Sequence, residues 1–468
     1  MLSLFIIIYL VGCGKKDYSS AINFPKAPPK ENLYDVSKIN DEKLWTTNNA
    51  HDPSIFKDKG WYYTFSTDAK VGGVPTPGVQ IRKSRDLIKW EWVGYAFQNG
   101  IPKDAEKWTE ATNLWAPDIT KIGDIYYLYY CASTFGTNQS FIGLATSKNV
   151  EGPYIDKGCV IKTQSGDENN AIDPNISYDT DGKPWMAYGS FFGGIHVVKL
   201  NGTSGELLNR GDQGTLIAKR NESVAGSVEA PYIIYNPELK KYYLFVSYNS
   251  LSSDYNVRVG RSDKIDGPYV DYNGLEMSDT TSLPMDVGNK ILGGYKFGNS
   301  AGWIAPGHNS VLKDDENYFI VHHARGEEDT NWPYLQVRKM LWSQDGWPLV
   351  SPERYDGEKE QKISKKVVVG QWENLVLDKN FNEQIQSASI KLLSNGKIEG
   401  GNSKDYWKFS DDNTLVLYFY QQENSPKGDY LIYKTKIIPS WDWENSKATL
   451  VYTGINQNGV SIWGKKIN

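Results

Sequence analysis

Cysteine is scarce in this chain of 468 residues, which has only three. Cys131 lies in the strand-like stretch IYYLYYCAS and Cys159 lies near a turn. One disulfide bond between them is compatible with an exported protein, but two cysteines cannot form the framework that supports small secreted domains. Metal binding through these two thiols is not expected.

Basic residues do not dominate, and long apolar stretches with helical spacing are missing. The net charge is −5 and the Lys and Arg residues are scattered. This distribution argues against a phosphate-binding groove, so we expect no nucleic-acid partner.

Aromatic residues make up 13% of the chain, with 16 Trp and 31 Tyr. Together with frequent Gly and Pro they predict an all-β protein, and flat aromatic rings also suit the apolar faces of sugars.

The N-terminus begins with the apolar run MLSLFIIIYLVGCGKK, which is too short to cross a bilayer as a helix. We interpret residues 1–12 as a signal peptide, although no basic residue precedes Leu4. The sequence Leu10-Val11-Gly12-Cys13 resembles the lipobox of bacterial lipoproteins, in which Cys13 would carry the lipid. A plain secretory peptide is the alternative. Residues 13–39 then read as the lipidated N-terminus and a linker that has too little apolar content to fold alone.

Five segments of the next region share one pattern, in which a proline is followed by apolar residues, a polar turn and a Tyr-rich strand. The prolines stand roughly 60 to 75 residues apart, which suits a four-stranded antiparallel blade. They are Pro53, Pro117, Pro174, Pro231 and Pro306. Five blades arranged in a ring leave only short strand edges exposed. We therefore predict a five-bladed β-propeller over residues 40–365.

The first strand of each propeller blade lines the central axis, so the residues that open the repeats should meet at one end of it. These residues are Asp52, Trp115, Asp173, Glu229 and His308. Three carboxylates, an aromatic ring and an imidazole in one concave site are not explained by packing. Two carboxylates that face each other across a sugar bond are what glycoside hydrolysis requires, and a third can raise the pKa of the acid.

The motifs HDPSI at 51–55, NLWAPDI at 113–119, NAIDPNI at 170–176, SVEAPYI at 227–233 and APGHNS at 305–310 resemble those of glycoside hydrolase family 43. Within that family they are most similar to endo-α-1,5-L-arabinanases. The resemblance covers all five repeats in order. It implies that Asp52 is the general base, Glu229 the general acid, and Asp173 the carboxylate that tunes and orients that acid. It also implies inversion at the anomeric carbon, for which the two catalytic carboxyl groups stand about 6.5 to 9.5 Å apart.

The resemblance further implies a set of substrate contacts and a cation. The substrate-binding residues would be Trp115, Phe135, Gly136, Asn170, Ala171, Ile172, Gly189, Ser190 and Phe191. His308 would be the one protein ligand of a hydrated cation, expected to be Ca²⁺, whose remaining ligands must be water.

Several other polar residues have structural interpretations. Asp118 follows a repeat proline, where strand alternation turns it away from the axis. His322 and His323 lie within a strand and are interpreted as packing or hydrogen-bonding residues, whereas Arg338 fits substrate contact and a surface ion pair equally well. His51 gives no clear indication of its own.

Residues 366–468 contain alternating segments separated by tight turns, which predict a small antiparallel β-barrel. Two roles stay open for it. It could be a buttress packed on the propeller, or a sugar-binding module that uses Trp441, Trp443 and Trp463.

The sequence therefore predicts a monomeric, exported, lipid-anchored hydrolase that cuts α-1,5-linked arabinan internally with inversion. One alternative is an exo-acting α-L-arabinofuranosidase or β-xylosidase with the same centre. In that case the insertion at residues 272–303 could form a wall of the site. The alternative from another class is a surface lipoprotein that binds glycans without cutting them.

Overall fold

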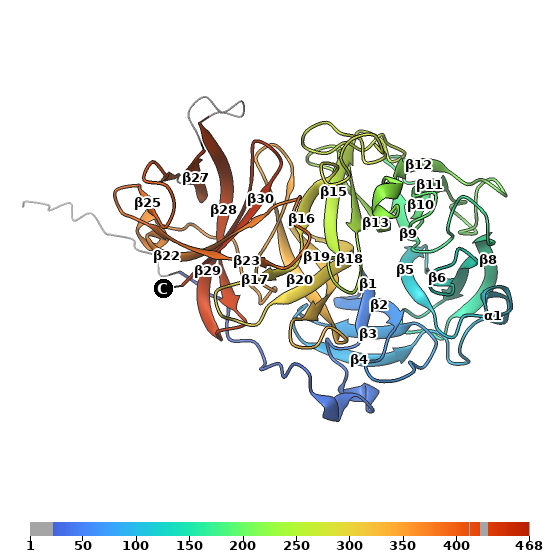
Figure 1. Cartoon of the computed structure of the whole chain (residues 1–468). Helices are drawn as coiled ribbons and strands as arrows, with labels where there is room; N and C mark the ends of the chain where they lie inside the picture. Colours follow the sequence, from blue (N-terminus) through green and yellow to red (C-terminus); the bar gives the residue numbers. More distant parts are fainter. Residues whose placement is uncertain (1–21, 411, 422–428, 468) are drawn as a thin grey trace, which may run out of the picture.

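The computed structural model describes residues 22–410, 412–421 and 429–467. The predicted signal peptide and the lipidation site at Cys13 lie outside the described residues. The fold is a five-bladed β-propeller followed by a barrel-like β-domain, as predicted (Figure 1). No helix in the described part of the chain has both the length and the apolar character needed to cross a membrane.

Each of the first four blades is a four-stranded antiparallel sheet whose strands follow chain order. The strands of blade 1 are β1 (Ala50–Asp58), β2 (Trp61–Asp68), β3 (Gln80–Ser84) and β4 (Trp90–Tyr95). Those of blade 2 are β5 (Trp115–Ile122), β6 (Ile125–Ala132), β7 (Ser140–Ser147) and β8 (Ile155–Thr163). Those of blade 3 are β9 (Asn175–Tyr178), β10 (Pro184–Tyr188), β11 (Ile195–Lys199) and β12 (Thr215–Ala218). Those of blade 4 are β13 (Val228–Asn236), β14 (Lys241–Tyr248), β15 (Asn256–Ser262) and β16 (Asn289–Leu292).

Blade 5 is enlarged by contributions from outside the repeat. Its own strands are β18 (Trp303–Asp314), β19 (Asn317–Gly326), β20 (Pro333–Trp342) and β21 (Pro348–Val350). The short strand β17 (Tyr295–Lys296) pairs with β18, and β23 (Ile385–Gln386) from the C-terminal domain pairs in parallel with β17. The two domains therefore share one six-stranded sheet.

The C-terminal domain is an eight-stranded antiparallel sheet that curls almost into a barrel. Its strands are β22 (Gly370–Leu377), β24 (Ala388–Leu392), β25 (Ile398–Glu399), β26 (Tyr406–Phe409), β27 (Thr414–Tyr420), β28 (Tyr430–Asp442), β29 (Lys447–Asn456) and β30 (Ser461–Lys466). An isolated bridge between Lys397 and Tyr406 links the two edge strands β25 and β26. The domain's own core lies inside the curl around Trp372 and Trp407.

Helices are few and short in the part of the chain that the structure describes. They are the α-helices α1 (Lys103–Thr109) and α2 (Lys365–Val368) and the 3-10 helices at Val36–Lys38, Glu42–Leu44 and Glu222–Val224.

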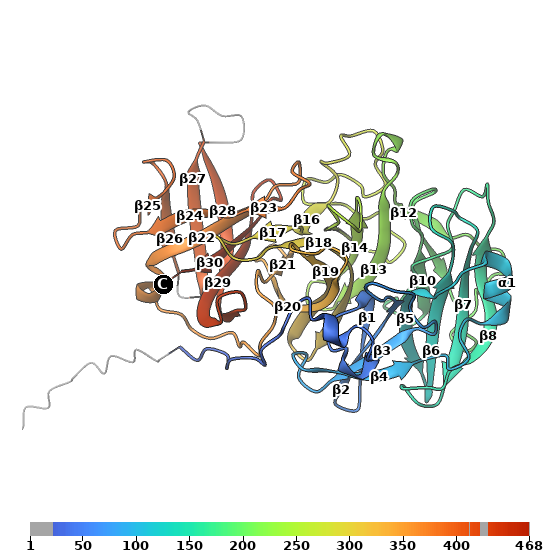
Figure 2. The ribbon, with the colours of Figure 1, turned by 60° about the horizontal axis from the view of Figure 1, so that its bottom comes forward.

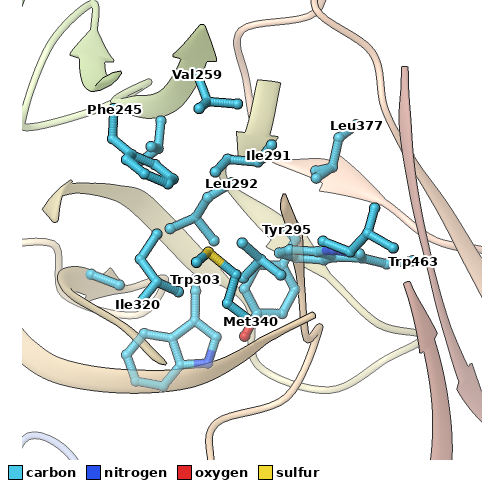
Figure 3. Close-up of a cluster of buried hydrophobic side chains, with 14 of the residues drawn as sticks. Phe245, Val259, Ile291, Leu292, Tyr295, Trp303, Ile320, Met340, Leu377 and Trp463 are labelled. Carbon is cyan, nitrogen blue, oxygen red and sulfur yellow. The ribbon is translucent and has the colours of Figure 1, made fainter. Parts of the chain in front are cut away.

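The barrel lies against blades 4 and 5 (Figure 2). A continuous apolar core joins the two domains there. In Figure 3, Leu377 and Trp463 from the barrel lie beside Ile291, Leu292 and Tyr295 from the propeller. The barrel segment after β22 is held by buried cations of blade 4, since Arg258 donates to the carbonyl of Lys379 at 2.9 Å. Lys290 donates to the carbonyl of Phe381 at 2.7 Å. The interface is thus both apolar and hydrogen-bonded.

These contacts favour the buttress role for the barrel. Trp463 is fully buried in the interface core and presents no surface to a sugar. The Trp443 indole donates to the backbone carbonyl of Arg354 at 2.9 Å, and the Arg354 guanidinium lies 4.2 Å from the centre of its ring. Trp463 therefore lies in the interface core and Trp443 is held by Arg354, so the three tryptophans do not form one sugar platform.

The N-terminal segment is more ordered than the predicted linker. From residue 22 it runs along both domains. Asn23 and Gln361 exchange two hydrogen bonds, Glu31 forms an ion pair with Arg354, and the Tyr34 backbone donates to the Tyr334 hydroxyl. The prediction missed this because each contact joins residues about 300 positions apart.

Cys131 and Cys159 are both free, so the disulfide bond left open by the sequence is not formed. Cys131 is buried in the sheet of blade 2, where its thiol donates to the Trp115 carbonyl at 3.0 Å.

Candidate active site

A residue with positive φ at the start of each blade redirects the chain beside the axis. In blades 1, 2, 4 and 5 it lies in a β-bulge, since the pairing of the first two strands shifts register there, between His51 and Ser54 in blade 1. In blade 3 it lies just before β9, whose pairing with β10 shows no shift. The φ is 31° to 58° in all five blades, and the residues are Asp52, Ala116, Asp173, Ala230 and His308. Positive φ is rare outside glycine and is disfavoured before proline, so this strain is concentrated where a bulge re-aims a side chain.

The register corrects the sequence alignment of the fifth repeat. The sequence pattern makes Pro306 the counterpart of the other four prolines, but β18 contains two successive shifts, and the second places His308 in the bulge. Asn309 therefore takes the position that proline occupies in the other blades. Trp115 and Glu229 stand one residue before the position with positive φ, whereas Asp52, Asp173 and His308 occupy it.

A pocket of about 640 Å³ lies where these residues meet. All five residues predicted to converge line it. Of the further predicted contacts, those that also line it are Phe135, Gly136, Asn170, Ile172, Ser190 and Phe191.

Two predicted contacts do not reach the pocket. Ala171 is fully buried in the core between blades 2 and 3. Gly189 has φ +125°, and a Cβ there would come within 2.3 Å of the Gly194 carbonyl oxygen. Both residues shape the backbone behind the site and do not offer a surface to a ligand. The insertion at residues 272–303 also contributes no side chain to the pocket, since β16 and β17 within it pack toward the barrel.

Sequence reasoning missed part of the lining. The additional residues are His51, Thr67, Thr134, Thr137, Phe192, Glu222, Ala225, Leu251. His51, Thr134, Thr137 and Phe192 directly adjoin predicted residues, so proximity in sequence could have indicated them. Thr67 lies on β2, and Glu222, Ala225 and Leu251 lie in connections between strands whose height depends on the packed blades.

Asp52 is the most densely hydrogen-bonded carboxylate of the site. His51 Nδ1 lies 2.8 Å from Oδ2, His308 Nδ1 lies 2.9 Å from Oδ1, and the Thr67 hydroxyl donates to Oδ2 at 2.5 Å. Burial alone would raise the pKa of Asp52, but the charges and hydrogen bonds of His308 and His51 outweigh it. They hold the pKa well below its usual value, so Asp52 is an ionised acceptor across the working range of pH.

Asp173 has the opposite protonation behaviour. Burial raises its pKa to about 7; His308 opposes this, whereas the carboxylates of Glu229 and Asp52 reinforce it. One oxygen accepts the backbone N–H of Ala230 at 3.0 Å, which ties Asp173 to the residue after Glu229. Asp173 therefore retains a proton close to neutral pH and sits against the strand that carries Glu229.

Two hydroxyl groups hold Glu229. The Tyr255 hydroxyl donates to Oε1 at 2.6 Å and the Ser190 hydroxyl donates to Oε2 at 2.8 Å. Ser190 lines the pocket and Tyr255 does not, so Oε2 is the oxygen on the pocket side.

His308 is available to a cation through one ring nitrogen. Burial lowers its pKa, but Asp52 and Asp173 overcome this and raise it to about 9, so a cation at Nε2 would have to displace the proton held there. Its Nδ1 faces Asp52, and no described residue is hydrogen-bonded to Nε2. A carboxylate that orients one nitrogen while the other stays open is the usual arrangement around a metal-bound histidine, so the donor set fits a hydrated cation with one protein ligand.

Aromatic and apolar side chains form the rim of the pocket. Phe135 is 81% exposed and Phe192 is 42% exposed, although both border a polar cleft. Exposed rings beside a pocket that contains carboxylates are typical of carbohydrate sites, where they cover the apolar faces of sugar rings. The pocket can therefore bind a polar, ring-containing ligand and exchange protons with it.

Other polar residues singled out from the sequence are structural. Asp118 is buried between blades and accepts the Ile176 backbone N–H at 2.6 Å. Arg338 is fully buried and donates to Tyr295 and His322, so it contacts neither substrate nor surface. His323 stacks on His51 with ring centres 3.8 Å apart, and its Nδ1 accepts the Asp52 backbone N–H at 3.3 Å.

Comparison with known proteins matches both domains. The family model described as "Glycosyl hydrolases family 43" covers residues 46–348, and that described as "C-terminal lipocalin-like domain" covers residues 352–464. An extracellular endo-α-(1→5)-L-arabinanase of Thermotoga petrophila is 32% identical, over 89% of this chain and 93% of its own. The crystal structure of the endo-1,5-α-L-arabinanase from Thermotoga petrophila RKU-1 superposes with a TM-score of 0.81 at 31% identity, over 91% of this chain and 99% of that one.

An extracellular exo-α-(1→5)-L-arabinofuranosidase of Cellvibrio japonicus is also similar. It is 33% identical, but over 67% of this chain and 90% of its own. The percentage of identical residues thus does not separate endo from exo action, because the two relatives are almost equally identical to this chain.

Proposed function

The chain belongs to glycosyl hydrolases family 43, and we propose that it is an arabinanase that cuts α-1,5-linked arabinan internally with inversion. One observation carries this proposal. Three carboxylates from three different blades meet in one pocket, and their surroundings separate them into an ionised acceptor, a residue that keeps its proton and a residue held by two hydroxyls.

We assign the chemical roles from these surroundings. Asp52 takes a proton from the attacking water, since it is ionised and faces the pocket. Glu229 gives a proton to the departing glycosidic oxygen. Asp173 keeps its own proton near neutral pH and accepts the Ala230 N–H, so it orients the strand that carries Glu229 without adding a second negative charge beside that acid.

A hydrated Ca²⁺ on His308 is part of the proposal. Nε2 would be its one protein ligand, with water completing the shell, and the cation would add positive charge near the carboxylates. Titration of the chelator-treated protein with Ca²⁺, followed by calorimetry, tests this. Wild type should bind one ion that H308A does not, and equal binding by both would remove His308 from the site.

Endo action is favoured by the relatives that match through both domains, which are named endo-arabinanases. The relatives that match about two thirds of the chain include both endo-acting and exo-acting enzymes. The other candidate, a propeller that only binds glycans, does not account for a protonated and an ionised carboxylate in one pocket.

Product analysis tests the function directly. Purified protein is incubated with linear arabinan, debranched arabinan and an aryl xyloside, and the products are separated by chromatography. A ladder of arabino-oligosaccharides is expected. Monosaccharide alone would support exo action, and the absence of product from every substrate would reject the enzymatic proposal.

Glu229→Ala tests the acid role. We expect a loss of about a hundredfold or more on arabinan, and a much smaller loss on an aryl arabinobioside whose nitrophenolate departs without protonation. Glu222→Ala, which removes a carboxylate from the rim of the same pocket, serves as the control. Equal losses on both substrates for E229A would remove Glu229 from the acid role.

We also propose that the protein is exported as a monomer and anchored by lipid on Cys13. Export is supported by relatives that are named extracellular enzymes. Incorporation of labelled palmitate into wild type but not into Cys13→Ser would support the anchor, and unlabelled wild type would reject it.

A further inference from the structure

Tyr255 makes the shortest polar contact to the proposed acid, at 2.6 Å from Glu229 Oε1. It lies immediately before β15, in the same blade as Glu229, and was not indicated by the sequence. Its side chain is buried with 1% exposure and lies outside the pocket lining. It therefore reaches the acid from behind and does not compete with a ligand.

The position of the Tyr255 ring is fixed on several sides. It stacks on His323 with ring centres 5.9 Å apart. The ring also packs closely against Gly307, because a Cβ at that position would come within 2.0 Å of the ring. The next residue, Asn256, accepts the Nε–H of buried Arg258 at 2.8 Å and donates to the Asp254 carbonyl at 3.1 Å. The Tyr255 hydroxyl is consequently held in position to donate its hydrogen bond to Glu229 Oε1.

The two oxygens of Glu229 are not equivalent. Tyr255 occupies Oε1, away from the pocket, whereas Oε2 lies beside Ser190, which lines it. A phenol is a donor toward a carboxyl oxygen, so the acidic proton of Glu229 is left to Oε2. After that proton is transferred, Glu229 is an anion, and a charge-assisted hydrogen bond from Tyr255 then becomes stronger.

We propose that Tyr255 is a positioning residue for acid catalysis, which places the proton of Glu229 on Oε2 and stabilises the carboxylate formed when that proton leaves. This rests on the proposed function. In the step, the Oε2 proton moves to the glycosidic oxygen as its bond to the anomeric carbon breaks. The water oxygen bonds to that carbon, and the water gives one proton to Asp52.

Tyr255→Phe tests the role, because it removes only the hydroxyl. A hydrogen bond to a charged group that strengthens in the transition state predicts a fall in kcat of about ten- to a hundredfold on arabinan, with KM almost unchanged. On the nitrophenyl arabinobioside the fall should be severalfold at most, since that leaving group needs no proton.

Tyr248→Phe is the matched control. Tyr248 is also fully buried in blade 4, but its hydroxyl has no hydrogen-bond partner among the described residues. Y248F should keep its kcat within about twofold on both substrates. Thermal unfolding of both variants shows whether they remain folded.

The outcomes separate this inference from the function on which it rests. Equal losses of Y255F on both substrates, or no loss on arabinan, would overturn the positioning role while E229A still discriminates between substrates. If E229A does not discriminate, the acid assignment itself fails. Should Y255F not fold, 3-fluorotyrosine at position 255 keeps the ring and strengthens the donor. It should raise the ratio of arabinan to aryl turnover, and an unchanged ratio would overturn the proposal.

Discussion

Asp52 and Asp173 are identical side chains with opposite surroundings. Two imidazoles and a hydroxyl hold Asp52 in its ionised form, whereas Asp173 has one backbone N–H and two neighbouring carboxylates. Residue type therefore does not decide the roles in this pocket. The charges that each bulge brings within reach decide them.

The pH dependence of activity should reflect this difference. Asp173 keeps its proton up to about pH 7, so kcat/KM on arabinan should fall as the pH rises above that value, because a negative charge on Asp173 opposes the anion that Glu229 becomes when it gives up its proton. Asn cannot ionise at this position, so in Asp173→Asn the basic limb should move to higher pH by about one unit. Rate profiles between pH 5 and 9 measure this. Asp181→Asn is the control, because it neutralises an exposed carboxylate in the same blade, and it should leave the pH profile unchanged. An unmoved limb in D173N would contradict the assignment.

At the level of strands, neighbouring blades are linked by polar residues that stand two positions after the residues with positive φ at the blade starts. The Ser54 hydroxyl donates to Asp118, which accepts the Ile176 N–H, and Asn175 accepts the Ile233 N–H at 2.8 Å. The Ser310 hydroxyl donates to the Pro53 carbonyl at 2.7 Å, between blades 5 and 1. These contacts align the first strands just below the pocket, so they set the geometry of the site without touching a ligand.

Asp118→Ala should destabilise the propeller. The substitution leaves the Ser54 hydroxyl, the Asn175 amide and the Ile176 N–H without their buried acceptor, which we expect to cost about 2 to 4 kcal/mol of the free energy of unfolding. Urea denaturation measures it. Asp124→Ala, in an exposed turn of the same blade, should cost less than about 0.5 kcal/mol. Similar losses in the two variants would show that the inter-blade contacts add no stability.

At the level of the whole molecule, a buried charge cluster joins the propeller to the barrel. The Lys465 ammonium lies 2.8 to 3.0 Å from Glu353, Asp442 and Glu444. Burial opposes ionisation of Glu444, but Lys465 and Arg354 hold its pKa at about 2. Burial and the nearby Glu444 raise the pKa of Glu353 to about 8, so one ammonium group does not stabilise every carboxylate around it.

Glu444 should make the stability of the whole chain depend on pH. Because its pKa in the folded protein is lowered, its contribution is present above the unfolded value near 4.5 and is lost as the pH falls toward 2. Glu444→Gln should therefore unfold at a lower temperature than wild type at pH 7, and the difference should shrink between pH 4.5 and 3. Glu399→Gln, on the exposed barrel surface, is the control. A difference that stays constant with pH would contradict this account.

The repeat pattern made the propeller predictable, because prolines, Tyr-rich strands and polar turns recur locally in the chain. The same pattern indicated Asp52, Asp173 and Glu229 as pocket residues. It could not indicate Tyr255 or Leu251, because the segment that carries them belongs to no repeat motif and reaches the site only through blade packing. The alignment of Pro306 failed for a related reason, since two consecutive bulges in β18 are a matter of register and leave no unique residue pattern.

The sequence by itself determined the blade number, the β-character of both domains and the chemical groups available for catalysis, because each follows from short-range spacing and residue type. Only the tertiary structure decided which carboxylate keeps its proton, which side of Glu229 faces the pocket and how the N-terminal segment and barrel support the ring. Burial and contacts between residues far apart in the chain set those properties, and neither is encoded in any single stretch of sequence.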